Sequence, residues 1–211
     1  REQNWKRNAA CFLTAQTVSL FGSSLAQYAI VWYITLSTSS GKMLTLSTLC
    51  GFLPQIGISL FAGVWIDRYN RKLMIMLPDI LIAASTLALA LAFLGGRRQV
   101  WFLFAVLAVR SAGTGVQTPA VNSAIPQLVP KEHLMRVSGI NSTLSSITMF
   151  LAPAASGALM SVAPLEAALM IDVVTAVLGV GLTAFVRLRP QPASGEESGS
   201  ALKQLRAGFS Y

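Results

Sequence analysis

Six long apolar runs alternate with short polar segments along this chain of 211 residues. The runs cover residues 9–35, 43–66, 73–94, 100–121, 137–160 and 166–186. Each run is about 20 residues or longer, which is the length that a helix needs to cross the hydrocarbon core of a bilayer. The pattern therefore predicts an all-α membrane protein with six transmembrane helices.

Composition supports this prediction and limits the partners of the chain. Hydrophobic residues make up 54% of the sequence and charged residues 11%, with a formal net charge of +8. A nucleic-acid-binding surface would gather its cations in one stripe interleaved with aromatic residues. Here the cations lie between the apolar runs, so we expect a lipid bilayer as partner and no nucleic acid.

The distribution of Lys and Arg predicts the orientation. If the first residues are cytoplasmic, twelve of the sixteen cations fall on inner segments and three, Lys42, Arg97 and Arg98, on outer loops. The sixteenth, Arg110, lies inside an apolar run. Because cytoplasmic loops carry an excess of Lys and Arg, we expect both termini in the cytoplasm. The pair Arg97-Arg98 runs against this bias.

A compact charged segment joins the second and third runs. It reads Gly-Val-Trp-Ile-Asp-Arg-Tyr-Asn-Arg-Lys over residues 63–72. It resembles the signature loop of major facilitator superfamily transporters, which has Gly, three residues, Asp, a basic residue, one residue, Gly and two basic residues. The departure is Asn70, where the family usually has Gly. Asn is the non-glycine residue that best tolerates positive φ, so we expect a left-handed turn at Asn70.

The resemblance implies that this loop acts as a gate on the inner side. The implied gating residues are a turn glycine, one acid and three cations: Gly63, Asp67, Arg68, Arg71 and Lys72. We expect the acid to face a helix amino-terminus or an arginine, and the cations to face acids or carbonyls of neighbouring helices.

The resemblance also implies the domain organisation. Family members carry twelve helices in two halves, and this chain looks like the amino-terminal half, a 3+3 repeat. We expect a six-helix transmembrane half over residues 1–190, and a cytoplasmic linker with the start of an amphipathic segment over residues 191–211. The implied setting is a bacterial-type plasma membrane. The second six-helix half would lie in the same polypeptide, if the chain is a fragment, or be a second copy, if it is complete.

Two stripes of polar residues interrupt the apolar runs at helical spacing. In the first and fourth runs the intervals are three or four residues, which places each stripe on one helical face. In hydrocarbon these groups must find a partner or water. We expect them to line a shared substrate cavity; the alternative is hydrogen bonding between helices, worth about 0.6 kcal/mol per contact. The residues are Gln16, Ser19, Ser23, Gln27, Arg110, Thr114 and Gln117.

Arg110 requires compensation, because a lone cation near the midplane costs several kcal/mol or more. Two acids, Asp79 and Asp172, lie inside other runs. An acid away from water is protonated unless a cation holds it ionised. Arg110 and one of these acids could therefore form a proton-coupling switch, or a permanent structural ion pair. Asp172 is slightly favoured, because Pro78 directly before Asp79 suggests a local turn or cap there.

Further segments narrow the resemblance. Pro153 and Gly157 are expected to bend the fifth helix, as in the Gly- and Pro-rich signature of drug–proton antiporters, although Ala152 stands where that signature usually has Gly. Residues 12–23, 110–113, 117–120 and 125–130 look like the macrolide-efflux branch. The resemblance implies proton-coupled efflux of an amphiphilic organic compound. The alternatives are a lysophospholipid flippase of the same fold and a non-transporting six-helix interaction or dimerisation module.

No enzymatic, metal or cofactor chemistry is expected. His133 is the single histidine, and Cys11 and Cys50 lie in separate apolar runs, which gives too few ligands for a zinc site. The glycine cluster at residues 113–115 lacks the Lys that follows in a nucleotide-binding loop. The expected partners are the bilayer, a small amphiphilic substrate, the proton and the second half.

Overall fold

The computed structural model describes residues 2–186, with side chains from Trp5 onward apart from those of Asp67 and Arg68. Six long helices occupy this part of the chain, and all are long and apolar enough to cross a membrane. They are α1 (Glu2–Thr38), α2 (Gly41–Arg68), α3 (Arg71–Leu94), α4 (Val100–Leu128), α5 (Leu134–Val162) and α6 (Leu165–Phe185), with the 3-10 turn η1 (Lys131–His133) before α5. The prediction of an all-α protein with six spanning helices is confirmed.

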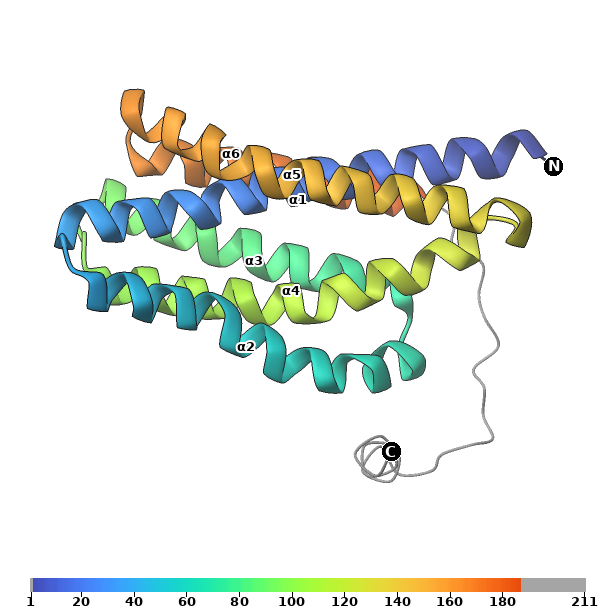
Figure 1. Ribbon diagram of the computed structural model, residues 1–211, viewed down its shortest axis with the longest axis horizontal. Coiled ribbons are helices and arrows are strands. Elements are labelled where there is room, and N and C mark those ends of the chain that lie inside the picture. The colour runs from blue at the N-terminus through green and yellow to red at the C-terminus, as the bar shows by residue number, and fades with distance from the viewer. Residues whose placement is uncertain (1, 187–211) are drawn as a thin grey trace.

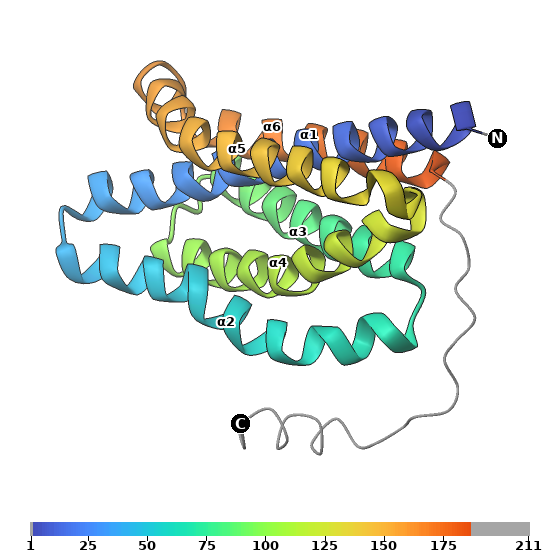
Figure 2. The same cartoon turned by 45° about the vertical axis from the view of Figure 1, so that its right-hand side comes forward.

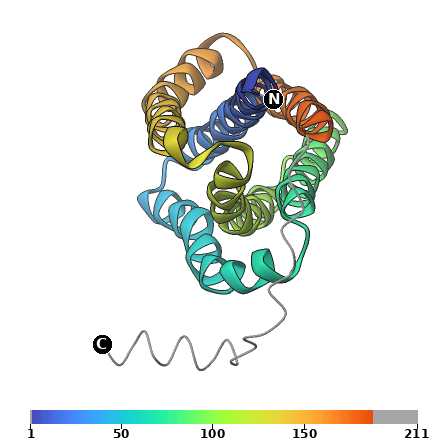
Figure 3. The ribbon, with the colours of Figure 1, turned by 90° about the vertical axis from the view of Figure 1, so that its right-hand side faces the viewer.

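The helices run side by side along the longest axis of the molecule (Figure 1). Seen end-on, α1 and α4 lie in the middle, α3 and α6 on one side, and α2 and α5 on the other (Figure 3). The spans of α2 and α5 are only 17% buried, against 33–44% for the other four. One side of the bundle therefore consists of two helices that the described part of the chain leaves largely uncovered.

The helices form two matching sets of three, as the sequence predicted. α3 packs against α4, and α6 packs against α1 in the same way. Gly113 of α4 approaches Ile82, three residues after Asp79, while Gly22 of α1 approaches Thr175, three residues after Asp172. Asp79 and Asp172 therefore occupy equivalent positions in the two repeats.

The interior has two apolar clusters with a polar layer between them. One cluster, toward the end of the bundle that carries Gly96, contains Ile34, Phe93 and Leu103. The other, toward the end that carries Lys72, contains Phe12 and Leu128 among its members. We call these ends the Gly96 end and the Lys72 end. Between the two clusters lie buried polar side chains that include Ser19, Asp79, Arg110 and Asp172.

The end of α4 differs from the prediction. The helix continues to Leu128, seven residues beyond the apolar run that ends at Val121, and it includes Pro126. A proline lacks the N–H that a helix interior uses, so Pro126 by itself disfavours this extension. Ala124 and Leu128 are buried in the cluster at the Lys72 end, and this packing holds the last turns of α4 in place.

The turn at Asn70 also differs from the prediction. Its φ is −60°, so it is not left-handed. Instead the Asn70 side chain accepts a hydrogen bond from the backbone N–H of Lys72 at 3.0 Å and caps the amino-terminus of α3. Asn is among the strongest N-cap residues, so it fits the family's loop through capping rather than through backbone freedom.

α2 changes direction about halfway along its length (Figure 2), where Pro54 lies inside the helix. A proline in a helix is a common cause of such bends. The next backbone N–H, that of Gln55, donates to Ser111 Oγ of α4 at 3.0 Å. A Cβ on Gly115 would lie 2.7 Å from the backbone oxygen of Gln55. α2 and α4 therefore cross here so closely that there is no room for a side chain at Gly115.

We predict that Gly115→Ala destabilises the bundle, because a backbone oxygen cannot swing aside as a side chain can. The expected loss is about 1–3 kcal/mol, the usual effect of overpacking, measured as a lower thermal midpoint of the full-length protein in detergent. Gly57→Ala in α2 is the matched control, because a Cβ there meets nothing within 4 Å. Equal midpoints for the two variants would contradict the close crossing.

Candidate functional site

A buried ion pair lies at the centre of the polar layer. Arg110 Nη1 of α4 lies 2.5 Å from Asp172 Oδ2 of α6, and both side chains are 1% exposed. Thr86 of α3 completes the group: its Oγ1 accepts from Arg110 Nη1 at 2.5 Å and donates to Asp172 Oδ2 at 3.0 Å. Of the two acids that the sequence offered Arg110, the structure places Asp172 against it.

The rest of the guanidinium reaches across to α1. Nη2 donates to the backbone oxygen of Ser23 at 2.5 Å and to its hydroxyl at 2.9 Å, and Nε donates to Gln27 Oε1 at 3.3 Å. Every nitrogen of the Arg110 head therefore has an acceptor. Through Arg110 one buried network ties α1, α3, α4 and α6 together.

Asp79 of α3 has a different environment. It is 4% exposed. Its Oδ1 accepts from Ser19 Oγ of α1 at 2.9 Å and from Gln117 Nε2 of α4 at 2.8 Å. Its Oδ2 has no hydrogen-bond partner among the described residues, and no described cation forms an ion pair with this carboxyl group. Asp79 is thus a buried acid held by neutral donors alone.

A cavity of about 90 Å³ lies in front of these groups, between α1, α4 and α5. Both predicted stripes contribute to its wall, with two exceptions: Gln27 and Arg110 do not line it but lie behind Ser23, to which Arg110 is bonded. The role of this cavity in binding a substrate stays a prediction. The lining residues are Gln16, Thr17, Ser19, Leu20, Ser23, Thr114, Gln117, Thr118, Val121, Asn122, Asn141 and Ser145.

The sequence reasoning missed five of the polar lining residues, the first of which is Thr17 of α1, directly after Gln16. Thr118 and Asn122 continue the face of Thr114 at intervals of four residues, so helical spacing would have found Thr118 within the fourth run, and Asn122 if that run had been extended by one residue. Asn141 and Ser145 belong to α5, also four residues apart. Nothing in the sequence says which face of the fifth helix meets the first and fourth.

The chemistry of the cavity wall is uniform. The polar lining side chains are hydroxyls and carboxamides, and the wall includes no charged and no aromatic residue. Such a wall holds a ligand through neutral hydrogen bonds. The described residues contain no group of three or more His, Cys, Asp or Glu that could hold a metal ion.

The predicted gating loop contacts two helix ends. Arg71 Nη1 donates to the backbone oxygen of Ser123 in α4 at 2.9 Å. Lys72 Nζ donates to the backbone oxygens of Ala184 and Val186, at the end of α6, at 2.5 and 3.1 Å. Cations stabilise helix carboxyl-termini in this way. The two predicted contacts with carbonyls are present; the gating role itself stays a prediction.

For the other three predicted loop residues the structure describes no side-chain contact. Gly63 is exposed, and a Cβ there would meet nothing within 4 Å. The side chains of Asp67 and Arg68 lie outside the described residues, as does the segment 191–211.

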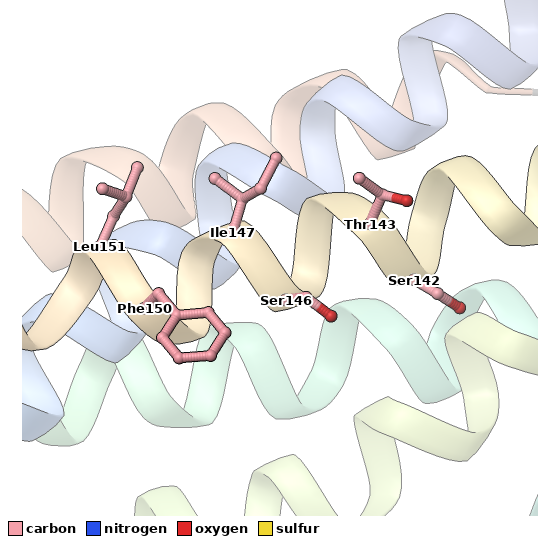
Figure 4. A pocket seen from close by; sticks show the side chains of 6 residues that line it. All are labelled: Ser142, Thr143, Ser146, Ile147, Phe150 and Leu151. Carbon is pink, nitrogen blue, oxygen red and sulfur yellow. The ribbon is translucent and has the colours of Figure 1, made fainter.

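The two residues expected to bend the fifth helix both lie in α5. Pro153 is inside the helix, and a Cβ on Gly157 would lie 3.8 Å from the Trp32 ring of α1. Their effect on the curvature of α5 stays a prediction. An open hollow of about 580 Å³ lies along the same helix. Figure 4 shows the six side chains that line it: Ser142, Thr143, Ser146, Ile147, Phe150 and Leu151. All six residues come from α5, so the hollow is an exposed face rather than an enclosed site.

Comparison with known proteins agrees with the geometry. A family model described as Major Facilitator Superfamily matches residues 12–209. Macrolide efflux protein A of Streptococcus pyogenes is 37% identical over 185 residues, which are 88% of this chain and 46% of that protein. The Multi-drug resistance efflux pump PmrA homolog of Lactococcus lactis is 25% identical over 152 residues, 70% of this chain and 36% of that protein. The chain thus spans about half the length, or less, of the curated relatives it matches.

A solved structure shows the same fold. It is a bacterial homolog of the human lysosomal transporter Spinster in an inward-facing, unoccupied conformation, with a TM-score of 0.61 at 16% identity. The match covers 98% of this chain and 49% of that one.

We predict that Arg110→Gln strongly destabilises the full-length protein, by about 3–5 kcal/mol, because it leaves the Asp172 carboxylate buried without its cation. The double variant Arg110→Gln/Asp172→Asn should recover most of that loss, since both charges are then gone. Thermal unfolding in detergent measures both. Additive losses in the double variant would show that the two residues do not act as a pair.

Proposed function

The chain belongs to the Major Facilitator Superfamily, and we propose that it forms one half of a transporter that exports amphiphilic organic compounds in exchange for protons. The transporter names of its relatives indicate a transporter rather than an enzyme, and several of those names specify macrolide or multidrug efflux. The observation that carries the proposal is a hydrogen-bonding cavity, lined by Ser19, Ser23 and Gln117, with two buried acids directly behind it. This arrangement supports the proposal, because a ligand in the cavity and a proton on either acid would belong to one hydrogen-bonded network.

The second six-helix half, in the same polypeptide or as a second copy, would cover the side formed by α2 and α5. These are the least buried spans. They present large exposed apolar side chains there, including Phe52 and Ile56 of α2 and Phe150 and Leu151 of α5. Packing of the second half on this side would enclose the cavity between the halves, and rocking of the halves would expose it alternately to the two faces of the membrane.

Proton coupling requires an acid whose charge changes during the cycle. Asp79 and Asp172 are the two acids buried in the polar layer, and both remain candidates under this proposal. Arg71 and Lys72, with Asp67 and Arg68, would act as the latch at the inner side.

We propose that the Lys72 end faces the cytoplasm in a bacterial-type plasma membrane and that both chain termini lie on that side. The Gly96 end carries Lys42, Arg97 and Arg98. Arg98 there forms an ion pair with Glu166 at 3.2 Å, with Arg98 60% exposed. This ion pair neutralises part of the positive charge of Arg97 and Arg98, the outer-loop cations that disagree with the positive-inside bias.

Transport by reconstituted full-length protein tests the function. A radiolabelled macrolide should accumulate in inside-out vesicles when their interior is made acidic, and a protonophore should abolish the accumulation. Equal accumulation with and without the proton gradient would contradict proton coupling. Movement of a labelled lysophospholipid in place of the macrolide would contradict the proposed substrate class.

The orientation has its own test, made in full-length protein in which Cys11 and Cys50 are replaced by Ala. We predict that Gly96→Cys is labelled by a membrane-impermeant thiol reagent added to intact cells, because it lies in the outer loop. Glu132→Cys in η1 should be labelled only after the membrane is opened. The reverse pattern would show that the chain is inserted the other way round.

A further inference from the structure

Asp79 does not line the cavity itself but is connected to it through a single layer of hydrogen-bonded side chains. Both side chains that donate to its Oδ1, Ser19 and Gln117, line the cavity wall. We propose that Asp79 sets the hydrogen-bonding character of this wall, so that a proton on Asp79 and a donor-rich substrate in the cavity exclude each other. The inference rests on the proposed transport function and assigns the coupling to one acid.

With Asp79 ionised, the wall presents acceptors. A carboxylate only accepts hydrogen bonds, so the Ser19 hydroxyl and the Gln117 amide group turn their protons toward Asp79. Ser19 Oγ then offers lone pairs to the cavity, and the carboxamide oxygen of Gln117 is left for a ligand. Bonds to a charged acceptor are roughly twice as strong as neutral ones, which holds both side chains in this orientation.

With Asp79 protonated, that hold is lost. The two bonds to Oδ1 become weaker neutral ones, so a ligand in the cavity can compete with Asp79 for the hydroxyl and amide protons. A ligand that offers its own O–H or N–H groups then meets donors instead of acceptors. The ligand class that this wall distinguishes is therefore an amphiphile with a face of hydroxyl or ammonium donors, and its binding releases one proton from Asp79.

Asp79 fits this role better than Asp172 does. The charged groups on the helices around Asp79 are Arg110 of α4 and Asp172 of α6, which pair with each other, Glu166 at the Gly96 end of α6, which pairs with Arg98, and charged residues at the Lys72 end of α1 and α3. Asp79 Oδ2 is buried without a partner among the described residues, so a proton there displaces no hydrogen bond. Asp172 would have to give up the bonds of Arg110 and Thr86.

The test measures substrate binding by purified full-length protein across a pH titration. The probe is a radiolabelled hydroxylated macrolide without an amino sugar, whose own charge does not change with pH. Release of one proton on binding predicts an affinity that rises about tenfold per pH unit until Asp79 is fully ionised. The same macrolide with its hydroxyls methylated should show no such rise.

In Asp79→Asn the affinity should not vary with pH, while the control Glu132→Gln, an acid in η1 outside the cavity, should keep the full dependence. A full dependence in Asp79→Asn overturns the proposal. If Asp79→Asn does not fold, the double variant Ser19→Ala/Gln117→Leu replaces it. This variant should bind without pH dependence, and a full dependence there likewise overturns the proposal.

A second readout separates this inference from the proposed function. If the wild-type protein binds no macrolide, the proposed substrate class fails, and infrared spectroscopy then tests Asp79 alone. The carbonyl stretch of a protonated carboxyl should appear as the pH falls, change frequency in Ser19→Ala and persist in Glu132→Gln. Absence of the band across the titration, or a band unaffected by Ser19→Ala, overturns the assignment; a band that shifts in Ser19→Ala supports it.

Discussion

The polar layer is organised around one constraint, the need to neutralise and solvate the Arg110 guanidinium inside an apolar bundle. Water is not available there to satisfy a cation, and an uncompensated charge at this depth costs several kcal/mol or more. Asp172 supplies the charge, and Thr86, Ser23 and Gln27 supply the remaining acceptors. Because these groups come from α1, α3 and α6, the relative positions of four helices follow from the needs of one side chain.

The internal repeat makes the contrast between the two acids informative. Asp79 and Asp172 occupy equivalent positions, but the α1 partner of Asp79 is the neutral Ser19 and the α4 partner of Asp172 is the cation Arg110. A symmetric scaffold therefore carries one acid held by charge and one held by neutral donors. The first suits a fixed brace between helices, and the second suits a group whose charge changes. This difference between the two acids agrees with the proton coupling proposed for Asp79.

Features that follow from local pattern were predictable from the sequence, and features that depend on contacts between distant segments were not. Hydropathy alone located the six spans, and intervals of three and four residues placed Ser19 and Gln117 on cavity-facing stripes. The sequence could only slightly favour Asp172 over Asp79 as the partner of Arg110, because spacing does not say which helix is adjacent. Asn141 was not predicted as a cavity residue for the same reason. The packing of α5 on α1 decides which face of α5 lines the cavity.

The contacts of the charged loop bear on how a half of this kind could move. Arg71 and Lys72 bind backbone oxygens of α4 and α6, within the same six helices. Such bonds stiffen the Lys72 end of the bundle by fixing the start of α3 to two neighbouring helix ends. Rocking transport requires each half to turn as a rigid body around a fixed site. The latch proposed for Arg71 and Lys72 would therefore act within the half, by holding the start of α3 against α4 and the end of α6.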